Sequence, residues 1–501
     1  MALFLGIDFG TSTNMVTYWN EDKKRAEPIY LGEYGEAGYF ANVIYYESEN
    51  NIIVGDVALA KGNSDFYNAV FSIKRRLESS DFRQYIPNLN RSLGTEEIVA
   101  DIFSWIKKNV EMKFGGQSID GVVISVPFAF QNTERERIKI AARRAGLPVL
   151  GLIEEPVAAA LSFGLFEDVK KLKAEKILVF DLGGGTFDVT IFEFLKQSAK
   201  NFKILVLTTD GEKQLGGIDI DDVLVKKFLE QLKADYPDYN LEAVSTEEQE
   251  KEIFSLRQFA IDVKENLSAE EEYDSLFESR LGTQYFLEKN FTREEFENYL
   301  REFLNEIENV LDSTLSGADL EPQDIDRIIM VGGTSNIPAI NEKVRQYFGK
   351  APEKIEDLET MVGRGAGLYC GLKYVEKNFD FDIAVGISKT TGIKWRGKFL
   401  EMLPRNTLYG TPSEVKILQL PQSTKVIKIP VVQGNSITNV KIGSVIVTPE
   451  ILSKLINGRI GVKLNTDANT GTISYELYKI VLFKNQLLPD KILSKGNIGD
   501  D

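Results

Sequence analysis

Histidine is absent from this chain of 501 residues, and cysteine occurs once, as Cys370. The lack of histidine excludes catalytic histidine bases, histidine zinc ligands and Ser-His-Asp triads. A single cysteine excludes an intrachain disulfide framework and fits a reducing compartment. The sequence also shows no signal peptide and no long apolar run. We therefore expect a soluble protein of the cytoplasm.

Basic residues are fewer than acidic residues in this chain. The chain has 59 Lys and Arg against 75 Asp and Glu, for a net charge of −16. This balance disfavours nucleic acid or an anionic membrane as the main partner. Hydrophobic residues make up 43% and charged residues 27%, which is ordinary for a globular protein with sizeable cores. The length predicts two to four domains.

The stretch 177–194 is the centre of the functional prediction, and it reads ILVFDLGGGTFDVTIFEF. A short apolar run precedes Asp181, three glycines and Thr186, and a second β-favouring run follows. This order predicts a β-hairpin with a glycine turn. Glycines let backbone N–H groups approach an anion closely, as in phosphate-binding nests. The adjacent carboxylate can hold a hydrated divalent cation.

The N-terminus repeats this pattern at 4–19, which reads FLGIDFGTSTNMVTYW. When the two stretches are aligned, Asp8 falls on Asp181, Gly10 on Gly183, Thr13 on Thr186, Val16 on Val189 and Thr17 on Thr190. One such hairpin is a weak signal, because it can be an ordinary turn. Two copies in one chain predict a duplicated domain that binds one phosphate chain between two hairpins.

For several candidate functional residues, the sequence is also compatible with a purely structural role. Lys74 follows a small apolar run and can belong to a solvated basic face. Glu155 begins a helix with Pro156 in its first turn, and a carboxylate there can simply complement the helix dipole. Capping boxes are expected at two helix starts, Thr133 with Glu136 and Thr292 with Glu295.

The chain divides into lobes of roughly 1–160 and 161–377, with glycines at 363, 365 and 367 opening the last helix of the second lobe. Residues 379–383 alternate apolar and acidic side chains, which predicts a linker at 378–388 that is able to add to a sheet as a β-strand. Short β-favouring runs separated by turn signals predict an antiparallel β-sandwich at 389–488. Residues 489–501 are expected to be a disordered tail.

Four motifs together resemble the Hsp70 (DnaK-like) chaperone family. They are GIDFGT at 6–11, EPVAAA at 155–160, DLGGGTFDV at 181–189 and VGGTS at 331–335. The resemblance covers residues 1 to about 377 and is weaker over the β-rich segment. It implies an α/β fold: a two-lobed, actin-like Hsp70 ATPase domain at 1–377, followed by an all-β sandwich domain that binds peptide. The C-terminal helical lid of the family is expected to be lacking.

The resemblance also implies roles for individual residues. Lys74 would orient the attacking water, with Glu155, Asp181, Thr186 and Asp188 completing the catalytic group. Mg²⁺ would be held through water by Asp8, Glu155 and Asp181, and K⁺ is a candidate further cation. The implied ATP/ADP-binding residues are Gly10, Thr11, Ser12, Thr13, Gly183, Gly184, Gly185, Gly216, Gly217, Lys264, Ser268, Gly332, Gly333, Thr334 and Asn336.

The sequence departs from the family pattern at four positions. Two arginines that hold adenine correspond to Glu265 and Asn336, and a ribose-binding glutamate corresponds to Ile261. An arginine that the family uses to dock J-domain co-chaperones corresponds to Gly151. These changes put adenine selectivity and a J-protein partner in question. In the family the linker docks near an arginine matching Arg135, which could here pair with the acids of the linker.

The sequence thus predicts a chaperone-type ATPase that couples nucleotide state to binding of unfolded or extended polypeptide. A nucleotide exchange factor is a further candidate partner. The alternative is a regulatory or scaffold homologue that binds nucleotide with little turnover and holds one dedicated partner. A third reading, an actin-like sugar kinase, leaves the linker and sandwich without a role.

Overall fold

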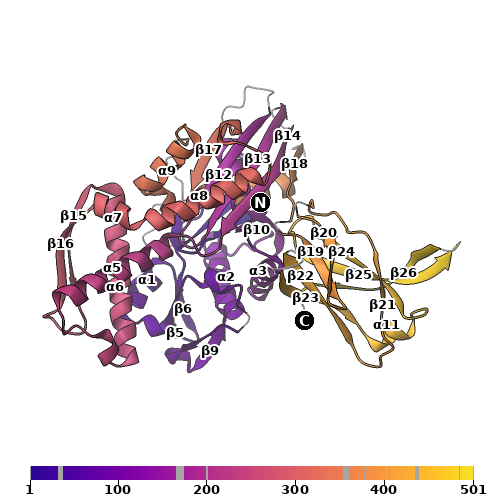
Figure 1. Ribbon diagram of the computed structural model, residues 1–501, viewed down its shortest axis with the longest axis horizontal. Helices are drawn as coiled ribbons and strands as arrows, with labels where there is room; N and C mark the ends of the chain where they lie inside the picture. Colours follow the sequence, from indigo (N-terminus) through magenta and orange to yellow (C-terminus); the bar gives the residue numbers. More distant parts are fainter. Residues whose placement is uncertain are drawn as a thin grey trace. The chain divides into compact units, whose positions relative to one another are not determined.

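The computed structural model describes residues 2–31, 38–79, 81–164, 174–198, 201–353, 360–376, 380–387, 389–405, 407–434, 439–483 and 486–499, with the backbone alone at 195–198, 201–203 and 380–384. The chain forms two compact units. The first comprises Met1–Ile177, Thr190–Thr209 and Thr360–Asp501, and the second comprises Leu178–Val189 and Asp210–Glu359. Figure 1 labels their elements. No helix in the described part of the chain is long and apolar enough to cross a membrane.

A mixed sheet lies at the centre of the N-terminal part of the first unit. Its strands follow the order β11-β10-β1-β2-β3, and β4 also pairs with β2. β1 is parallel to β10 and antiparallel to β2, so β1 and β2 form the predicted hairpin. The bounds are β1 (Phe4–Phe9), β2 (Thr13–Asn20), β3 (Arg25–Pro28), β4 (Tyr39–Ala41), β10 (Gly121–Val126) and β11 (Val149–Glu154).

Helices and smaller sheets complete this region. A large core joins the apolar faces of the sheet and the helix α2, where Ile98, Ile102 and Ile106 are fully buried at helical spacing. The remaining elements are β5 (Val43–Ser48), β6 (Asn51–Val54), α1 (Asp56–Ser64), β7 (Ala69–Phe71), the 3₁₀ turn η2 (Ile73–Arg76), β8 (Arg83–Ile86), β9 (Arg91–Gly94), α2 (Thr95–Lys113), α3 (Asn132–Arg144) and α4 (Glu155–Gly164).

The glycine-rich helix α10 (Met361–Tyr374) belongs to this first unit. Its expected place in the second lobe was therefore wrong. A Cβ atom at Gly6 would lie 2.0 Å from Gly367 N, and one at Gly365 would lie 1.8 Å from Ala158 O. These glycines are needed because the backbone of α10 contacts β1 and α4 directly.

The second unit is mainly helical, with a two-stranded sheet of β15 and β16. Apolar residues of α8 at Phe303, Ile307 and Leu311 are buried, as their helical spacing predicts. The elements are α5 (Gly217–Asp235), α6 (Thr246–Ala269), β15 (Glu272–Glu278), β16 (Phe286–Thr292), α7 (Arg293–Tyr299), α8 (Arg301–Ser316), β17 (Arg327–Val331), the 3₁₀ turn η6 (Gly333–Asn336) and α9 (Pro338–Phe348).

A five-stranded sheet follows the order β17-β12-β13-β14-β18. Its strands β12 (Glu175–Leu182), β13 (Phe187–Ser198) and β14 (Asn201–Glu212) contribute residues to both units. The last strand, β18 (Asp380–Ala384), is the predicted linker, and it pairs in parallel with β14 from Asn201 to Leu205. Side chains of the linker lie outside the described residues, so their expected faces stay a prediction.

The C-terminal β domain is a sandwich of two four-stranded sheets, ordered β20-β19-β22-β23 and β21-β24-β25-β26 (Figure 1). Their inward side chains form one apolar core that includes Ile393, Val431 and Leu464. The bounds are β19 (Thr391–Trp395), β20 (Lys398–Leu403), β21 (Lys416–Gln419), β22 (Ile427–Gly434), β23 (Asn439–Val447), α11 (Pro449–Ser453), β24 (Arg459–Thr466), β25 (Ile473–Phe483) and β26 (Gln486–Asn497).

Two local predictions were wrong. The expected disordered tail contains most of β26, which pairs with β25, and Ile498 beyond it is fully buried. The expected capping box at Thr133 does not form, because α3 begins at Asn132 and Glu136 pairs with Lys139. At Thr292 the hydroxyl does accept the Glu295 N–H, while the Glu295 carboxylate pairs with Lys289.

Candidate functional site

The first glycine turn connects β1 to β2 and contains Gly10, Thr11 and Ser12, and Thr13 begins β2. A Cβ atom at Gly10 would lie 2.2 Å from Thr13 O, so the turn tolerates no side chain there. Asn42, between β4 and β5, fixes the turn, because its backbone N–H donates to Ser12 O (2.7 Å) and its Nδ2 donates to Gly10 O (2.5 Å). Sequence reasoning missed Asn42.

A buried charged cluster lies in the same unit and brings together three predicted residues, Asp8, Lys74 and Glu155. Lys74 Nζ lies 2.5 Å from Glu155 Oε1, and both side chains are buried. Asp8 Oδ1 accepts a hydrogen bond from Ser125 Oγ at 2.6 Å. η2 supplies the lysine, β1 and β10 supply Asp8 and Ser125, and α4 begins with Glu155.

The protonation of Asp8 reflects this burial. Desolvation, with a further contribution from the negative charge of Glu155, raises the pKa of Asp8 from 3.8 to about 7. The positive charge of Lys74 and the Ser125 hydrogen bond act in the opposite direction. Two carboxylates and one lysine are thus held in a space where an additional cation would be favourable.

The second glycine turn, Gly183 to Thr186, lies in the other unit. Asp181 is the next-to-last residue of the preceding strand and Asp188 lies in the following one, and both are buried. Gly183 N donates to Thr186 O at 3.1 Å across the turn. The start of α5 contacts the same turn, because Gly217 N donates to Gly183 O at 3.1 Å.

A third glycine segment joins this group. The Thr334 hydroxyl donates to Gly183 O at 2.9 Å, and Gly332 has φ 83°. A Cβ atom at Gly332 would lie 2.3 Å from Leu182 O. Gly184 accepts from the Ile218 N–H, and a Cβ atom at Gly216 would lie 2.7 Å from Gly185 N. The predicted glycines of this unit therefore converge on one turn.

Lys264 of α6 also reaches this turn region. Its Nζ lies 2.6 Å from Asp221 Oδ1 and 3.4 Å from Gly217 O. Burial raises the pKa of Asp221, and the lysine charge opposes that rise. Ser268 lies one turn further along α6, where its hydroxyl donates to Lys264 O at 2.7 Å. Gly333 and Asn336 are the two ends of η6.

Comparison with known proteins identifies the family. The family model described as "Hsp70 protein" matches residues 4–470. The chain belongs to the Hsp70 family. Its fold is accordingly the α/β, two-lobed actin-like domain followed by a β-sandwich.

Three relatives are each described as "Chaperone protein DnaK". The protein from Thermosipho melanesiensis is 32% identical over 410 residues, which cover 80% of this chain and 65% of the relative. That from Mycoplasmopsis synoviae is 32% identical over 86% of this chain and 69% of its own. That from Nitrosopumilus maritimus is 29% identical over 94% of this chain and 72% of its own. The chain thus spans less than two thirds of the first of these relatives.

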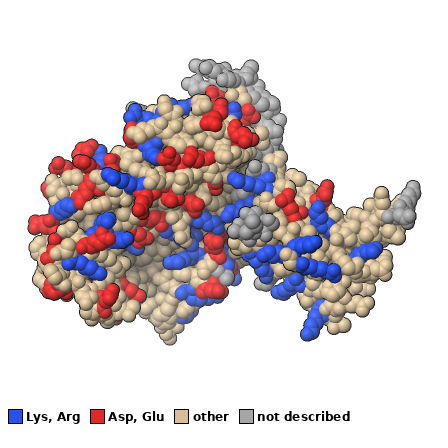
Figure 2. All heavy atoms as spheres, viewed as in Figure 1, with Lys and Arg blue, Asp and Glu red and all other residues tan. Residues whose placement is uncertain are grey.

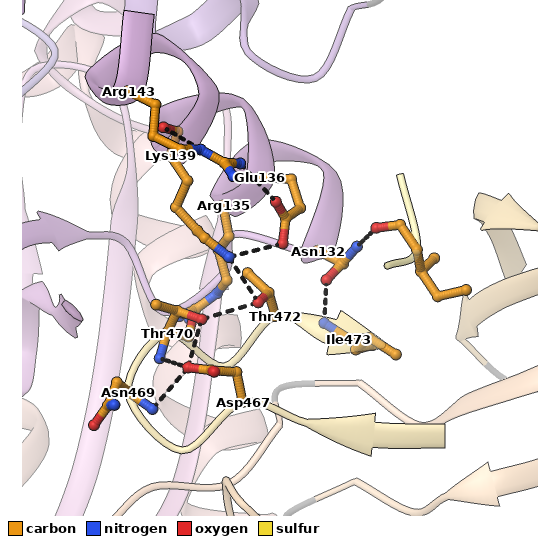
Figure 3. A network of polar contacts seen from close by, with 11 residues as sticks. Asn132, Arg135, Glu136, Lys139, Arg143, Asp467, Asn469, Thr470, Thr472 and Ile473 are labelled. Atoms are coloured by element: carbon orange, nitrogen blue, oxygen red, sulfur yellow. Dashed lines mark hydrogen bonds and ion pairs between the residues drawn. The ribbon is translucent and has the colours of Figure 1, made fainter. Parts of the chain in front are cut away.

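This Hsp70 chain has a polar contact between α3 and the β domain within its first unit (Figure 3). Asn132 is buried at the start of α3, donates to Ile498 O (2.6 Å) and accepts from Ile473 N (2.5 Å). The Lys139 ammonium donates to the Thr472 hydroxyl at 3.1 Å. Leu152 N of β11 donates to Asn469 O at 2.9 Å.

A buried ion pair lies behind this contact. Arg135 Nη1 is 2.9 Å from Glu154 Oε1 and donates to Thr470 O at 3.2 Å. The Tyr409 hydroxyl of the β domain donates to the same glutamate oxygen at 2.8 Å. Burial holds the pKa of Tyr409 well above its usual range, so the phenol stays a donor. The expected pairing of Arg135 with the linker acids stays untested, because those side chains lie outside the described residues.

Gly151 explains one departure from the family pattern. A Cβ atom there would lie 3.1 Å from Asn469 O and 3.1 Å from Tyr374 Oη. The backbone of the β domain therefore lies close to the position where the family has an arginine. Sequence reasoning missed Asn132, Glu154 and Tyr409. No sequence signal separated Glu154 from an acid that simply complements the dipole of the following helix.

Proposed function

We propose that this chain binds ATP or ADP with Mg²⁺ and hydrolyses ATP. The observation that carries the proposal is the buried cluster of Asp8, Lys74 and Glu155 beside a glycine turn. The glycine cradle at Gly10 and the raised pKa of Asp8 fit a phosphate chain with a divalent cation. The cation, when bound, neutralises the phosphate charge.

The residues of each unit would have distinct roles. The turn residues Gly10 to Thr13 and Gly183 to Thr186 would donate backbone and hydroxyl hydrogen bonds to phosphate oxygens. The carboxylates Asp8, Glu155 and Asp181 would hold the cation through water. Lys74 would orient the attacking water, and Thr186 with Asp188 would complete the catalytic group and could accommodate K⁺. The adenine base of the nucleotide would lie near a further set of residues: Gly216, Gly217, Lys264, Ser268, Gly332, Gly333, Thr334 and Asn336.

We further propose that nucleotide state controls binding of extended polypeptide by the β domain. Glu154 and Glu155 are consecutive, and they face different partners. Glu155 pairs with Lys74 in the cluster, whereas Glu154 binds Arg135 and Tyr409 at the contact with the β domain. A shift of this backbone on nucleotide binding would therefore alter the β-domain contact. Residues 1–377, 378–388 and 389–499 would be the ATPase domain, the linker and the peptide-binding domain.

Single-turnover ATP hydrolysis tests the proposed activity. Lys74→Ala should abolish hydrolysis, because no other predicted residue would orient water, while nucleotide binding stays within a few-fold of wild type. Since the change leaves Glu155 buried and unpaired, the melting temperature is measured in parallel. Lys61→Ala, which removes an exposed pair with Glu47, is the matched control and should hydrolyse normally. Equal rates in Lys74→Ala and wild type would show that Lys74 has no such role.

A further inference from the structure

One end of the β-sandwich is formed by three segments, 395–398, 419–428 and 454–459, which we name the basic end surface. Hydrogen bonds join them directly. Arg396 Nη2 donates to Gln419 O at 3.2 Å, and Gln419 Nε2 donates to Asn457 O at 2.7 Å. Leu420 N donates to Gly458 O at 2.9 Å. The three segments are therefore one continuous surface.

The charge of this surface is of one sign. The three segments contain Arg396, Lys398, Lys425, Lys428, Lys454 and Arg459, and their sequences contain no Asp or Glu. Glu450 of the adjacent α11 pairs with Lys454 at 2.6 Å, and its side chain is 78% exposed. Over 389–501 the chain has 16 Lys and Arg against 8 Asp and Glu, although the whole chain is strongly acidic. Figure 2 shows Lys and Arg side chains spread over the visible face of this domain.

Apolar side chains lie among these charges. Val426 is 49% exposed and Ile456 is 45% exposed. The guanidinium of Arg396 lies over the ring of Trp395, at 5.9 Å from its centroid. Exposed aliphatic groups gain free energy when another apolar surface covers them.

The basic end surface lies at the far end of β19 and β22 from the contact with α3. The other end of these strands pairs Thr391 with Gln433, whose side-chain oxygen accepts the Asn132 N–H. Strands of this length span well over 10 Å. A partner at the basic end would therefore not meet α3.

We propose that the basic end surface binds an extended polypeptide in which acidic residues flank apolar ones. This inference rests on the proposed polypeptide-binding function and names its substrate class. Carboxylates of the partner would pair with Arg396, Lys398 and Lys425, while its apolar side chains would cover Val426 and Ile456. A nucleic acid would satisfy the charges but leave these aliphatic side chains exposed, so a polypeptide is the better match.

Fluorescence anisotropy on the full chain with ADP tests the proposal. The probes are three labelled peptides with the same leucine-rich core and flanks of glutamate, glutamine or lysine. The acidic peptide should bind about tenfold more tightly than the lysine-flanked one at low salt, from two or three exposed charge pairs. The preference should fall to about twofold in ~0.5 M NaCl, because exposed charges are screened.

Two variants locate the effect. The double change Arg396→Glu and Lys425→Glu should remove the preference for acidic flanks. Lys389 lies before the start of β19, outside the basic end surface. Lys389→Glu changes the charge of the domain in the same direction and should keep the preference for acidic flanks. Equal binding of the three peptides overturns the inference but leaves the proposed function standing. If none of the peptides binds, the proposed polypeptide binding itself fails. Displacement of the acidic peptide by oligodeoxythymidylate at lower concentrations than by unlabelled peptide also overturns the inference.

Discussion

The negative charge of Asp8 lowers the stability of the nucleotide-free protein, but the proposed function needs this charge to hold a cation. Its side chain is half-buried next to Glu155, and desolvation of the carboxylate raises its pKa from 3.8 to about 7. A raised pKa means that the folded state holds the proton more tightly than the unfolded state does. The stabilisation from this proton is complete below about pH 4 and is lost as the pH rises to about 7. Above pH 7 the charged form costs stability unless a cation is bound.

Asp8→Asn should therefore stabilise the nucleotide-free protein at pH 8, by about 1–3 kcal/mol, because it removes a buried charge without changing the side-chain shape. The difference from wild type should shrink as the pH falls to about 5. Thermal unfolding at both pH values measures this. The same variant should lose the stabilisation that Mg²⁺ and ADP give to wild type. A variant less stable than wild type at pH 8 would show that the Asp8 charge is not costly.

Cys370 has no place in the proposed chemistry. It is fully buried in α10, and burial raises the pKa of its thiol to about 12. A thiol in that state is a poor nucleophile at neutral pH. The cysteine is thus part of the contact between α10 and the N-terminal sheet.

At the scale of elements, α3 is the part of the first unit that holds the β domain. Asn132 begins this helix, and its buried amide bonds two separate backbone segments of the domain, Ile473 N and Ile498 O. An unpaired backbone N–H in a buried position costs about 1–3 kcal/mol. Asn132 therefore stabilises the β-domain contact by pairing two backbone groups of the domain.

Asn132→Ala should loosen this contact. We expect faster hydrogen–deuterium exchange in peptides that contain Ile473 and Leu152, whose amides donate across it. Asn109→Ala is the matched control, because the Asn109 amide donates within its own helix, to Trp105 O. It should leave both peptides unchanged. Unaltered exchange in Asn132→Ala would mean that the other contacts hold the domain without it.

The elements that sequence reasoning located best have strong local signals. Both glycine turns and the alternating strands of the sandwich follow from apolar periodicity and turn residues. The errors arose where tertiary contacts, and not the local sequence, determine the structure or placement of an element. Most of β26 lies in the stretch that we expected to be disordered, yet it pairs with β25 as the last strand of its sheet. The placement of α10 depended on glycine contacts with β1 that no local pattern reveals.

The sequence predicted which residues belong to the candidate site better than it predicted which of them contact one another. Gly183 to Thr186, Gly216, Gly217 and Thr334 were chosen from separate motifs, and the fold brings them to one turn. The family resemblance placed Lys74 and Glu155 in one catalytic group, but it did not predict the direct ion pair between these residues, which lie 81 positions apart. Asn42, Ser125 and Glu154 are buried polar residues that sequence alone cannot separate from surface ones.

At the scale of the whole molecule, the proposal requires that nucleotide and polypeptide affect one another. A ligand shifts an equilibrium only through its different affinity for the two states. The consecutive acids Glu154 and Glu155 link the cluster to the β-domain contact, and β18 joins the linker to β14. Both connections lie in the described backbone of the first unit, and the proposed coupling would act through them.

The most direct measurement is the affinity of a labelled apolar peptide for the full chain, titrated by fluorescence anisotropy with ADP and again with ATP. Lys74→Ala is used alongside wild type, so that hydrolysis does not convert one state into the other. We predict that ATP weakens peptide binding several-fold, a coupling of about 1–2 kcal/mol. Identical dissociation constants with both nucleotides, under conditions where each nucleotide is bound, would contradict the account.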